Sequence, residues 1–126
     1  MIYGLGVDAT SIQRCLNKDE HFVKKYFHGD EYERWKELEV SSPGLRAQFL
    51  ASRFAVKEAY AKARGTGFCA DVVPCEINTV TDRDGKPEVR LYGKTLASHP
   101  AGCTVHVSVT HEDTLAIAVV IIEKES

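Results

Sequence analysis

The chain has 126 residues, of which 44% are hydrophobic and 27% are charged, and its formal net charge at pH 7 is −2. This length predicts a single domain over residues 1–126 with a core of modest size. A slightly acidic chain lacks the basic excess of proteins that bind nucleic acids or membrane surfaces in general, so neither is expected as a partner.

The amino terminus and the cysteines indicate a cytoplasmic protein. The first residues lack a basic n-region, and an acid follows at Asp8, so no signal peptide is expected. The longest apolar run, residues 115–122, is too short to cross a bilayer. The four cysteines form no C-x-x-C pair, so we expect free, mostly buried thiols in a reducing cytoplasm and no zinc site.

Residues 2–8 predict a short strand with two different faces. One face is apolar, and the other carries Gly4, Gly6 and Asp8. Glycine inside a strand indicates close approach of a ligand or of another backbone, so we expect open space beside Asp8. Asp8 then serves either in a functional site or as a cap of the next segment. The match to the dinucleotide fingerprint G-x-G-x-x-A is rejected, because no full strand precedes it.

Three short helical segments are predicted next, over residues 11–16, 19–27 and 31–38. Asp30 is expected to cap the third of them. Arg14, Lys24 and Lys25 form a small basic cluster on the first two segments. Composition alone favours a solvated helix face for this cluster.

A long helix is predicted over residues 43–64, because Ser42 can cap it, a proline suits its first position and Gly65 follows its last residue. The helix is apolar nearly all round, which is typical of a buried helix. Glu58 and Lys62 nevertheless lie one turn apart on it. An ion pair between them would contribute only about 0.2–0.5 kcal/mol, whereas burying a charge costs several times more. We therefore favour a functional site over a helical ion pair.

The second half of the chain predicts, in order, two hairpin strands, a short helix and two further strands, over residues 76–81, 87–92, 93–98, 104–110 and 115–122. Residues 82–85 form the hairpin turn. The last strand is apolar on both faces, so the long helix or another subunit must cover its second face.

These segments together resemble a known family. The motifs are G-V-D at residues 6–8, R-F-A-V-K-E-A-Y-A-K-A at residues 53–63 and G-T-G at residues 65–67. They closely resemble the holo-acyl-carrier-protein synthases, the short type of 4′-phosphopantetheinyl transferase. The resemblance extends over nearly the whole chain and implies an α+β fold, in which an antiparallel sheet wraps on one long helix and the sheets meet at a trimer interface. One departure is the loop at residues 68–74, where the family often has a further glycine.

The resemblance implies a cytoplasmic enzyme of fatty acid biosynthesis. It would transfer 4′-phosphopantetheine from coenzyme A to a serine of apo-acyl carrier protein and release 3′,5′-ADP. Asp8 and Glu58 would hold a magnesium ion, and Lys62 would act as a catalytic residue on the phosphates. The serine proton would pass to Glu58 or to a metal-bound water, and the sequence leaves this choice open.

The resemblance also implies two sets of binding residues. The coenzyme A set comprises Arg53, Lys57, Gly85, Lys86, Pro87, Thr110 and His111. Within this set, Arg53 and His111 are assigned to the 3′-phosphate; as a polar residue on a buried helix, Arg53 is otherwise expected to snorkel. Arg14, Lys24 and Lys25 are expected to dock the acyl carrier protein.

Two other functions stay open at this point. One is a broader transferase for polyketide or peptide-synthetase carriers, and the other is a non-catalytic coenzyme A-binding module. The second would have no need for both Asp8 and Glu58.

Overall fold

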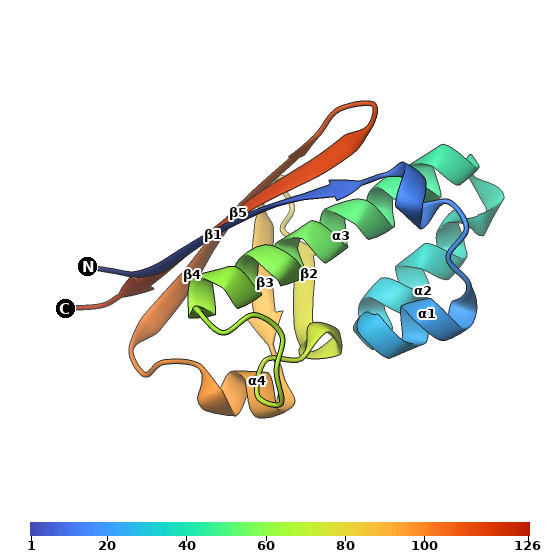
Figure 1. The fold of residues 1–126 in the computed structure, drawn as a ribbon. Coiled ribbons are helices and arrows are strands. Elements are labelled where there is room, and N and C mark those ends of the chain that lie inside the picture. The colour runs from blue at the N-terminus through green and yellow to red at the C-terminus, as the bar shows by residue number, and fades with distance from the viewer.

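The computed structural model covers residues 1–126 and combines five strands with four α-helices (Figure 1). The strands are β1 (Ile2–Ser11), β2 (Ile77–Thr81), β3 (Pro87–Leu91), β4 (Cys103–His111) and β5 (Leu115–Lys124). The helices are α1 (Glu20–Tyr26), α2 (Gly29–Glu37), α3 (Pro43–Arg64) and α4 (Gly93–Ser98), with 3₁₀ turns η1 (Gln13–Cys15), η2 (Leu38–Val40) and η3 (Pro74–Glu76).

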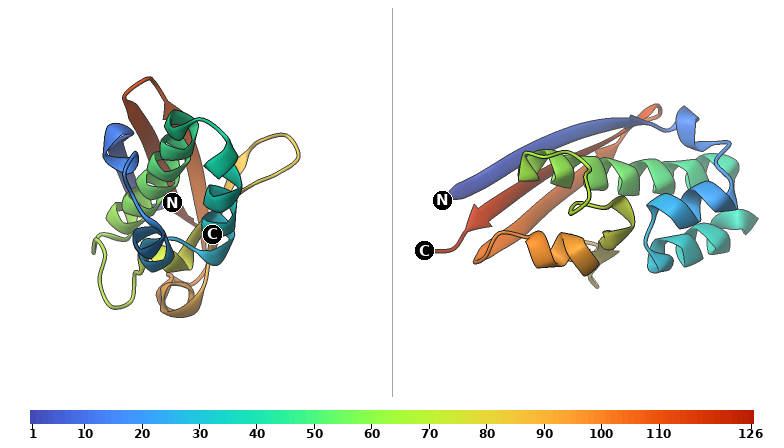
Figure 2. Two further views of the ribbon diagram at one scale, coloured as in Figure 1. Left: turned by 90° about the vertical axis from the view of Figure 1, so that its right-hand side faces the viewer. Right: turned by 60° about the horizontal axis from the view of Figure 1, so that its bottom comes forward.

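The strands form two separate antiparallel units. The main sheet has the order β1-β5-β4, and β2 and β3 form a separate hairpin. Both termini lie at one end of the molecule, while α1 and α2 pack at the opposite end of α3 (Figure 2). No helix is both long and apolar enough to span a bilayer.

Helix α3 has the bounds that its capping residues predict. The Ser42 side chain accepts a hydrogen bond from the backbone N–H of Leu45 at 3.1 Å, and Gly65 follows the helix in the left-handed conformation with φ +82°. Both termini are therefore determined by residues that are local in sequence.

Strand β1 runs along α3 at backbone contact distance (Figure 1). A Cβ atom added to Gly4 would lie 1.8 Å from the carbonyl oxygen of Ala63, and one added to Gly6 would lie 2.0 Å from that of Ala59. The open space expected beside these glycines is thus filled by α3. This close approach places the third residue of the same face, Asp8, over the helix.

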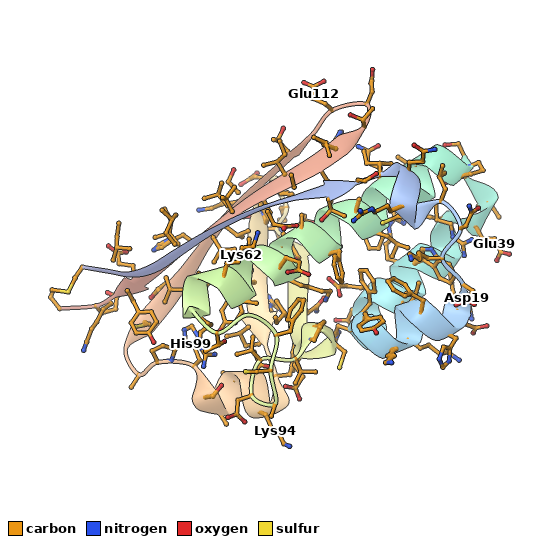
Figure 3. The ribbon with its side chains drawn as sticks, in the orientation of Figure 1. Asp19, Glu39, Lys62, Lys94, His99 and Glu112 are labelled. Atoms are coloured by element: carbon orange, nitrogen blue, oxygen red, sulfur yellow. The ribbon has the colours of Figure 1, made fainter.

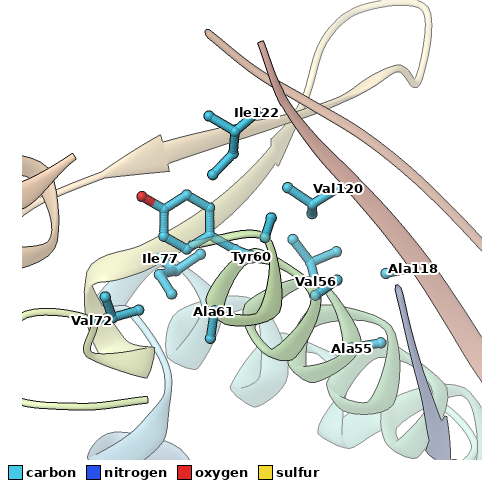
Figure 4. Close-up of a cluster of buried hydrophobic side chains, with 11 residues drawn as sticks. Ala55, Val56, Tyr60, Ala61, Val72, Ile77, Ala118, Val120 and Ile122 are labelled. Carbon is cyan, nitrogen blue, oxygen red and sulfur yellow. The ribbon is translucent and has the colours of Figure 1, made fainter. Parts of the chain in front are cut away.

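Two hydrophobic clusters pack on α3. The larger joins its carboxyl-terminal half to β5 and the β2 region (Figure 4), and it includes Val56, Ala59, Tyr60, Val72, Ile77, Ala118, Val120 and Ile122. The smaller joins its amino-terminal half to α1 and α2, and it includes Val23, Phe27, Trp35, Leu50 and Ala116. One face of β5 is therefore covered by α3.

The other face of the main sheet is apolar and uncovered in the single chain. On β1 the exposed fractions are 49% for Tyr3, 62% for Leu5 and 55% for Val7. Leu5 pairs with Ile121 of β5, and Val7 pairs with Val119. We call this surface the apolar sheet face, and it consists of Tyr3, Leu5, Val7, Ile117, Val119 and Ile121.

Several boundaries differ from the sequence predictions. Strand β1 continues to Ser11, so the helix predicted at residues 11–16 is reduced to the single turn η1. His28 rather than Asp30 caps α2, because its Nδ1 accepts a hydrogen bond from the Asp30 N–H at 3.1 Å. All four thiols are free as expected, but only Cys15 is buried.

Candidate active site

The site is built around Asp8, which projects from β1 towards α3. Its Oδ1 accepts a hydrogen bond from Lys62 Nζ at 3.2 Å, and its Oδ2 accepts one from Thr10 Oγ1 at 2.8 Å. Lys62 Nζ also donates to the carbonyl oxygen of Val7 at 3.0 Å. Figure 3 shows Lys62 on α3. Lys62 therefore pairs with Asp8 across two elements, and the Glu58–Lys62 helical pair does not form.

Glu58 is half-buried and has neither a hydrogen bond nor an ion pair. Burial raises the pKa of its carboxyl group, and the charge of Asp8 raises it further, whereas the charge of Lys62 lowers it. Two carboxylates and one lysine thus share a small volume. Such an arrangement attracts a further cation or a proton.

A cavity of about 260 Å³ opens beside these two carboxylates. Arg14 and Lys18 contribute its basic side chains, and its apolar wall includes Phe22, Phe27 and Phe54. The cavity therefore offers charge for an anionic group and an apolar surface next to it. Of the predicted docking residues, only Arg14 lines it.

Lys24 and Lys25 lie on the outer surface of α1. Lys24 Nζ is 3.2 Å from Glu20 Oε1, and Lys25 Nζ lies 5.2 Å from the ring centroid of Tyr26. No sequence pattern singles out Lys18, which falls between two helical segments. Its Nζ is 4.5 Å from the Phe22 ring centroid, which holds it at the cavity.

Arg53 and His111 line a second cavity of about 350 Å³ between α3 and β4. Arg34 and Phe49 also line it, and Thr110 precedes His111 on β4. The structure thus brings together the two residues assigned to a phosphate, and it adds Arg34, which no sequence pattern indicated.

Lys57 does not reach either cavity. Its side chain is 0% exposed, and its Nζ donates hydrogen bonds to Glu31 Oε1 at 2.5 Å and to the carbonyl oxygen of Pro74 at 3.0 Å. A binding role for Lys57 requires an accessible ammonium group, whereas the structure places that group in a buried ion pair between α2 and α3.

The hairpin residues Gly85, Lys86 and Pro87 lie apart from the first two cavities. Gly85 has φ +80° in the β2–β3 turn, and Lys86 and Pro87 line a cavity of about 320 Å³ against β4. The predicted binding residues therefore divide into three groups on one chain.

The first two groups lie on different sides of α3. Arg53 and Glu58 are five residues apart, which corresponds to about 140° around a helix. The cavity with Asp8 and Glu58 shares no residue with the cavity of Arg53 and His111.

The fold and site together correspond to a known class of proteins. Residues 4–120 match the family model of the 4′-phosphopantetheinyl transferase superfamily. Because this match covers nearly the entire chain, the chain belongs to that superfamily.

Individual relatives place the chain more closely, among the holo-[acyl-carrier-protein] synthases. The protein of that name from Geobacillus sp. (strain WCH70) is 40% identical over 129 residues, with 100% of both chains covered. That from Treponema denticola is 39% identical, with 98% of this chain and 99% of the relative covered.

Solved structures confirm the fold. The holo-(acyl-carrier-protein) synthase from Bacillus anthracis, in complex with CoA (3′,5′-ADP), matches with a TM-score of 0.83 at 31% identity and covers 99% of each chain. The synthase from Neisseria meningitidis matches with a TM-score of 0.85 at 30% identity, covering 98% of this chain and 100% of that one.

Proposed function

We propose that the chain transfers 4′-phosphopantetheine from coenzyme A to a serine of apo-acyl carrier protein, in the cytoplasm and in the service of fatty acid biosynthesis. The observation that carries this proposal is the pair of carboxylates Asp8 and Glu58 at one cavity, with Lys62 bound to Asp8 at 3.2 Å, in a member of the synthase family. A non-catalytic coenzyme A-binding module would have no use for two adjacent carboxylates. The four free thiols suit a reducing compartment.

In the proposed reaction, the serine oxygen of the carrier attacks the β-phosphorus of coenzyme A. A new oxygen–phosphorus bond forms, the bond from the β-phosphorus to the bridging oxygen breaks, and 3′,5′-ADP departs with the electron pair. Phosphoryl transfer depends chiefly on positioning and on neutralisation of charge. Lys62 supplies a positive charge beside Asp8, and Glu58, which has no hydrogen-bond partner, is proposed to accept the serine proton.

The donor set of the site fits a magnesium ion. Glu58 has no partner and experiences the charge of Asp8, so a cation between the two carboxylates would relieve their repulsion. No group of three or more His, Cys, Asp or Glu side chains is arranged to hold a metal. Magnesium commonly binds to one or two carboxylates, substrate phosphates and waters. When bound, the ion would neutralise the pyrophosphate of the donor.

A homotrimer would complete the donor site. The cavity of Arg53 and His111 lies on a different side of α3 from Glu58, so a neighbouring subunit would present it to the same coenzyme A molecule. The apolar sheet face supports such an assembly, since contiguous exposed apolar surfaces mark interaction sites. The hairpin residues Gly85, Lys86 and Pro87 are proposed to contact the adenine.

The acidic carrier is proposed to dock beside the first cavity. The whole chain is slightly acidic, so a local basic surface must attract an acidic partner. Arg14 lines the cavity and Lys18 joins it, while Lys24 and Lys25 extend the basic surface along α1.

The release of 3′,5′-ADP from coenzyme A tests this function. We expect release only when apo-acyl carrier protein is present, and none with a carrier whose acceptor serine is replaced by alanine. Equal release with and without the carrier would contradict transfer. Parallel reactions with apo carriers of polyketide and peptide synthetases would reveal a broader range.

A further inference from the structure

All buried side-chain N and O atoms without a hydrogen-bond partner lie around one cavity. They are Arg53 Nε, Asn78 Oδ1 and Thr79 Oγ1, and their residues line a cavity of about 360 Å³ between α2, α3 and β2. Asn78 is 1% exposed and Thr79 is 4% exposed. Buried polar atoms are nearly always hydrogen-bonded, so three unpaired atoms at one place indicate a polar ligand.

Arg34 and Arg53 line this cavity together with the carboxylates of Asp30 and Glu31. Arg53 has no carboxylate within ion-pair distance, and Glu31 is occupied by the buried Lys57 at 2.5 Å. Burial lowers the pKa of Arg53; the charge of Glu31 opposes this effect, and the charge of Arg34 adds to it. Arg34 pairs only with Glu37, at 3.4 Å on the surface, where such pairs contribute little. Of the two carboxylates at the cavity, Glu31 pairs with Lys57, and Asp30 accepts a hydrogen bond from Asn78 Nδ2 at 3.1 Å, so neither forms an ion pair with Arg34 or Arg53.

This cavity adjoins the one that contains His111. Arg34, Phe49 and Arg53 line both cavities, so Arg53 lies between His111 on one side and Thr79 on the other. A ligand on Arg53 is thus within a groove whose polar groups come from α2, α3, β2 and β4.

We propose that Arg34 and Thr79 join Arg53 in binding the 3′-phosphate of the donor, and that Asn78 accepts a hydrogen bond from the neighbouring ribose hydroxyl. This inference rests on the proposed function, and it identifies residues that set the preference for a 3′-phosphorylated donor. Guanidinium groups bind phosphate through paired N–H donors, the Thr79 hydroxyl supplies another donor, and Asn78 Oδ1 can only accept. A ribose 3′-phosphate carries the matching groups on adjacent carbons.

The test compares coenzyme A with 3′-dephospho-coenzyme A as donor. Wild type is expected to prefer coenzyme A in kcat/KM. Arg34→Ala should reduce this preference about tenfold or more, since it removes a charge-assisted contact. Thr79→Val, which keeps the shape but loses the hydroxyl, should reduce it about two- to tenfold. Arg90→Ala is the matched control, because Arg90 is exposed on β3 and has no ion pair.

Unchanged donor preference in both Arg34→Ala and Thr79→Val, with wild-type melting curves, would overturn the inference. Calorimetry with 3′,5′-ADP and with 5′-AMP, which lacks only the 3′-phosphate, provides a second measurement that needs no catalysis. The two variants should lose affinity for 3′,5′-ADP and keep their affinity for 5′-AMP. If wild type transfers nothing from either donor, the proposed function fails, and the calorimetry still decides whether Arg34 and Thr79 bind the phosphate.

Discussion

Of Asp8, Glu58 and Lys62, Glu58 is the one whose side chain has neither a hydrogen bond nor an ion pair. Lys62 binds Asp8 at 3.2 Å, while the Glu58 carboxylate is half-buried and has no partner. A protein retains such a group at a cost in stability, and sites of catalysis are where this cost is commonly found. This environment supports the proposal that the pair of carboxylates has a chemical rather than a structural purpose.

Asp8→Ala and Glu58→Ala should fold normally and lose transfer by about 100-fold or more, the range typical for removal of a preorganised charge that stabilises a transition state. Glu58→Gln should be equally damaging, because the amide keeps the shape and loses the charge. Initial rates in magnesium measure the effect, and Glu88→Ala on exposed β3 is the control. Near wild-type rates in either alanine variant would contradict the assignment of Asp8 and Glu58.

His99 provides a prediction about pH. Its Nε2 lies 3.0 Å from the carbonyl oxygen of Cys103, which can only accept, so Nε2 carries the proton. Its Nδ1 then accepts from the Tyr60 hydroxyl at 2.6 Å, and this requires a neutral ring. Burial lowers the pKa of His99; the bond to Cys103 raises it, and the charge of Arg64 lowers it further.

Because folding lowers the pKa of His99, the unfolded chain binds more protons in the interval between the two pKa values, and stability rises with pH there. The contribution is complete above the unfolded pKa of about 6.5 and is lost as the pH falls through the folded pKa. Urea unfolding at several pH values should show a shallower pH dependence in His99→Gln than in wild type. The exposed His21→Gln is the control, and an identical slope in His99→Gln would refute the role of His99.

At the scale of elements, the contact of β1 with α3 positions the site. An added Cβ on Gly6 would meet the Ala59 carbonyl oxygen at 2.0 Å and the Ala63 nitrogen at 2.8 Å, so backbone would have to move. Asp8 lies two residues further along the same strand. Packing on α3 and the geometry of the carboxylate pair are therefore coupled.

Gly6→Ala should lower the free energy of unfolding by about 1–3 kcal/mol, the usual cost of overpacking, and should lower kcat because Asp8 moves relative to Glu58. Gly44→Ala is the matched control, since nothing lies within 4 Å of a Cβ at that helical position. Urea titrations and transfer rates measure both effects. A Gly6→Ala variant with unchanged stability and rate would show that the close contact is not required.

Local signals predicted the elements well, and contacts between distant residues were harder to foresee. The capping pattern of α3 lies within a few residues, so its bounds followed from sequence. The glycines of β1 indicated a close approach but not that α3 was the neighbour. Lys57 was assigned to coenzyme A from the family resemblance, and the sequence could not show that Glu31, 26 residues earlier, binds it in the interior. Arg34 can be recognised as a candidate binding residue only from the structure, in which α2 places it at the same cavity as Arg53.

At the scale of the whole molecule, the apolar sheet face explains why the sequence of β5 is apolar on both of its faces. Strand β5 is apolar on both sides; Ala116, Ala118, Val120 and Ile122 face α3 and are 0% exposed, whereas the alternate residues remain on the surface. The long helix covers one face only. A neighbouring subunit is the proposed cover of the other.

Ile117→Lys should dissociate the proposed trimer and leave the secondary structure of each chain intact, because a charge at the interface is unfavourable while the residue is outside the core. Ala118→Lys should instead unfold the chain, since Ala118 is 0% exposed. Sedimentation and circular dichroism distinguish these two outcomes. A wild-type protein that is an active monomer at micromolar concentration would exclude the trimer as a requirement.

Transfer of the phosphopantetheine group itself is measured most directly by mass spectrometry of an apo-acyl carrier protein after incubation with this chain, coenzyme A and magnesium. We predict a mass increase of one phosphopantetheine group on the acceptor serine, absent without coenzyme A and strongly reduced with Glu58→Ala. A carrier whose mass stays unchanged with the folded wild-type chain would contradict the proposed function.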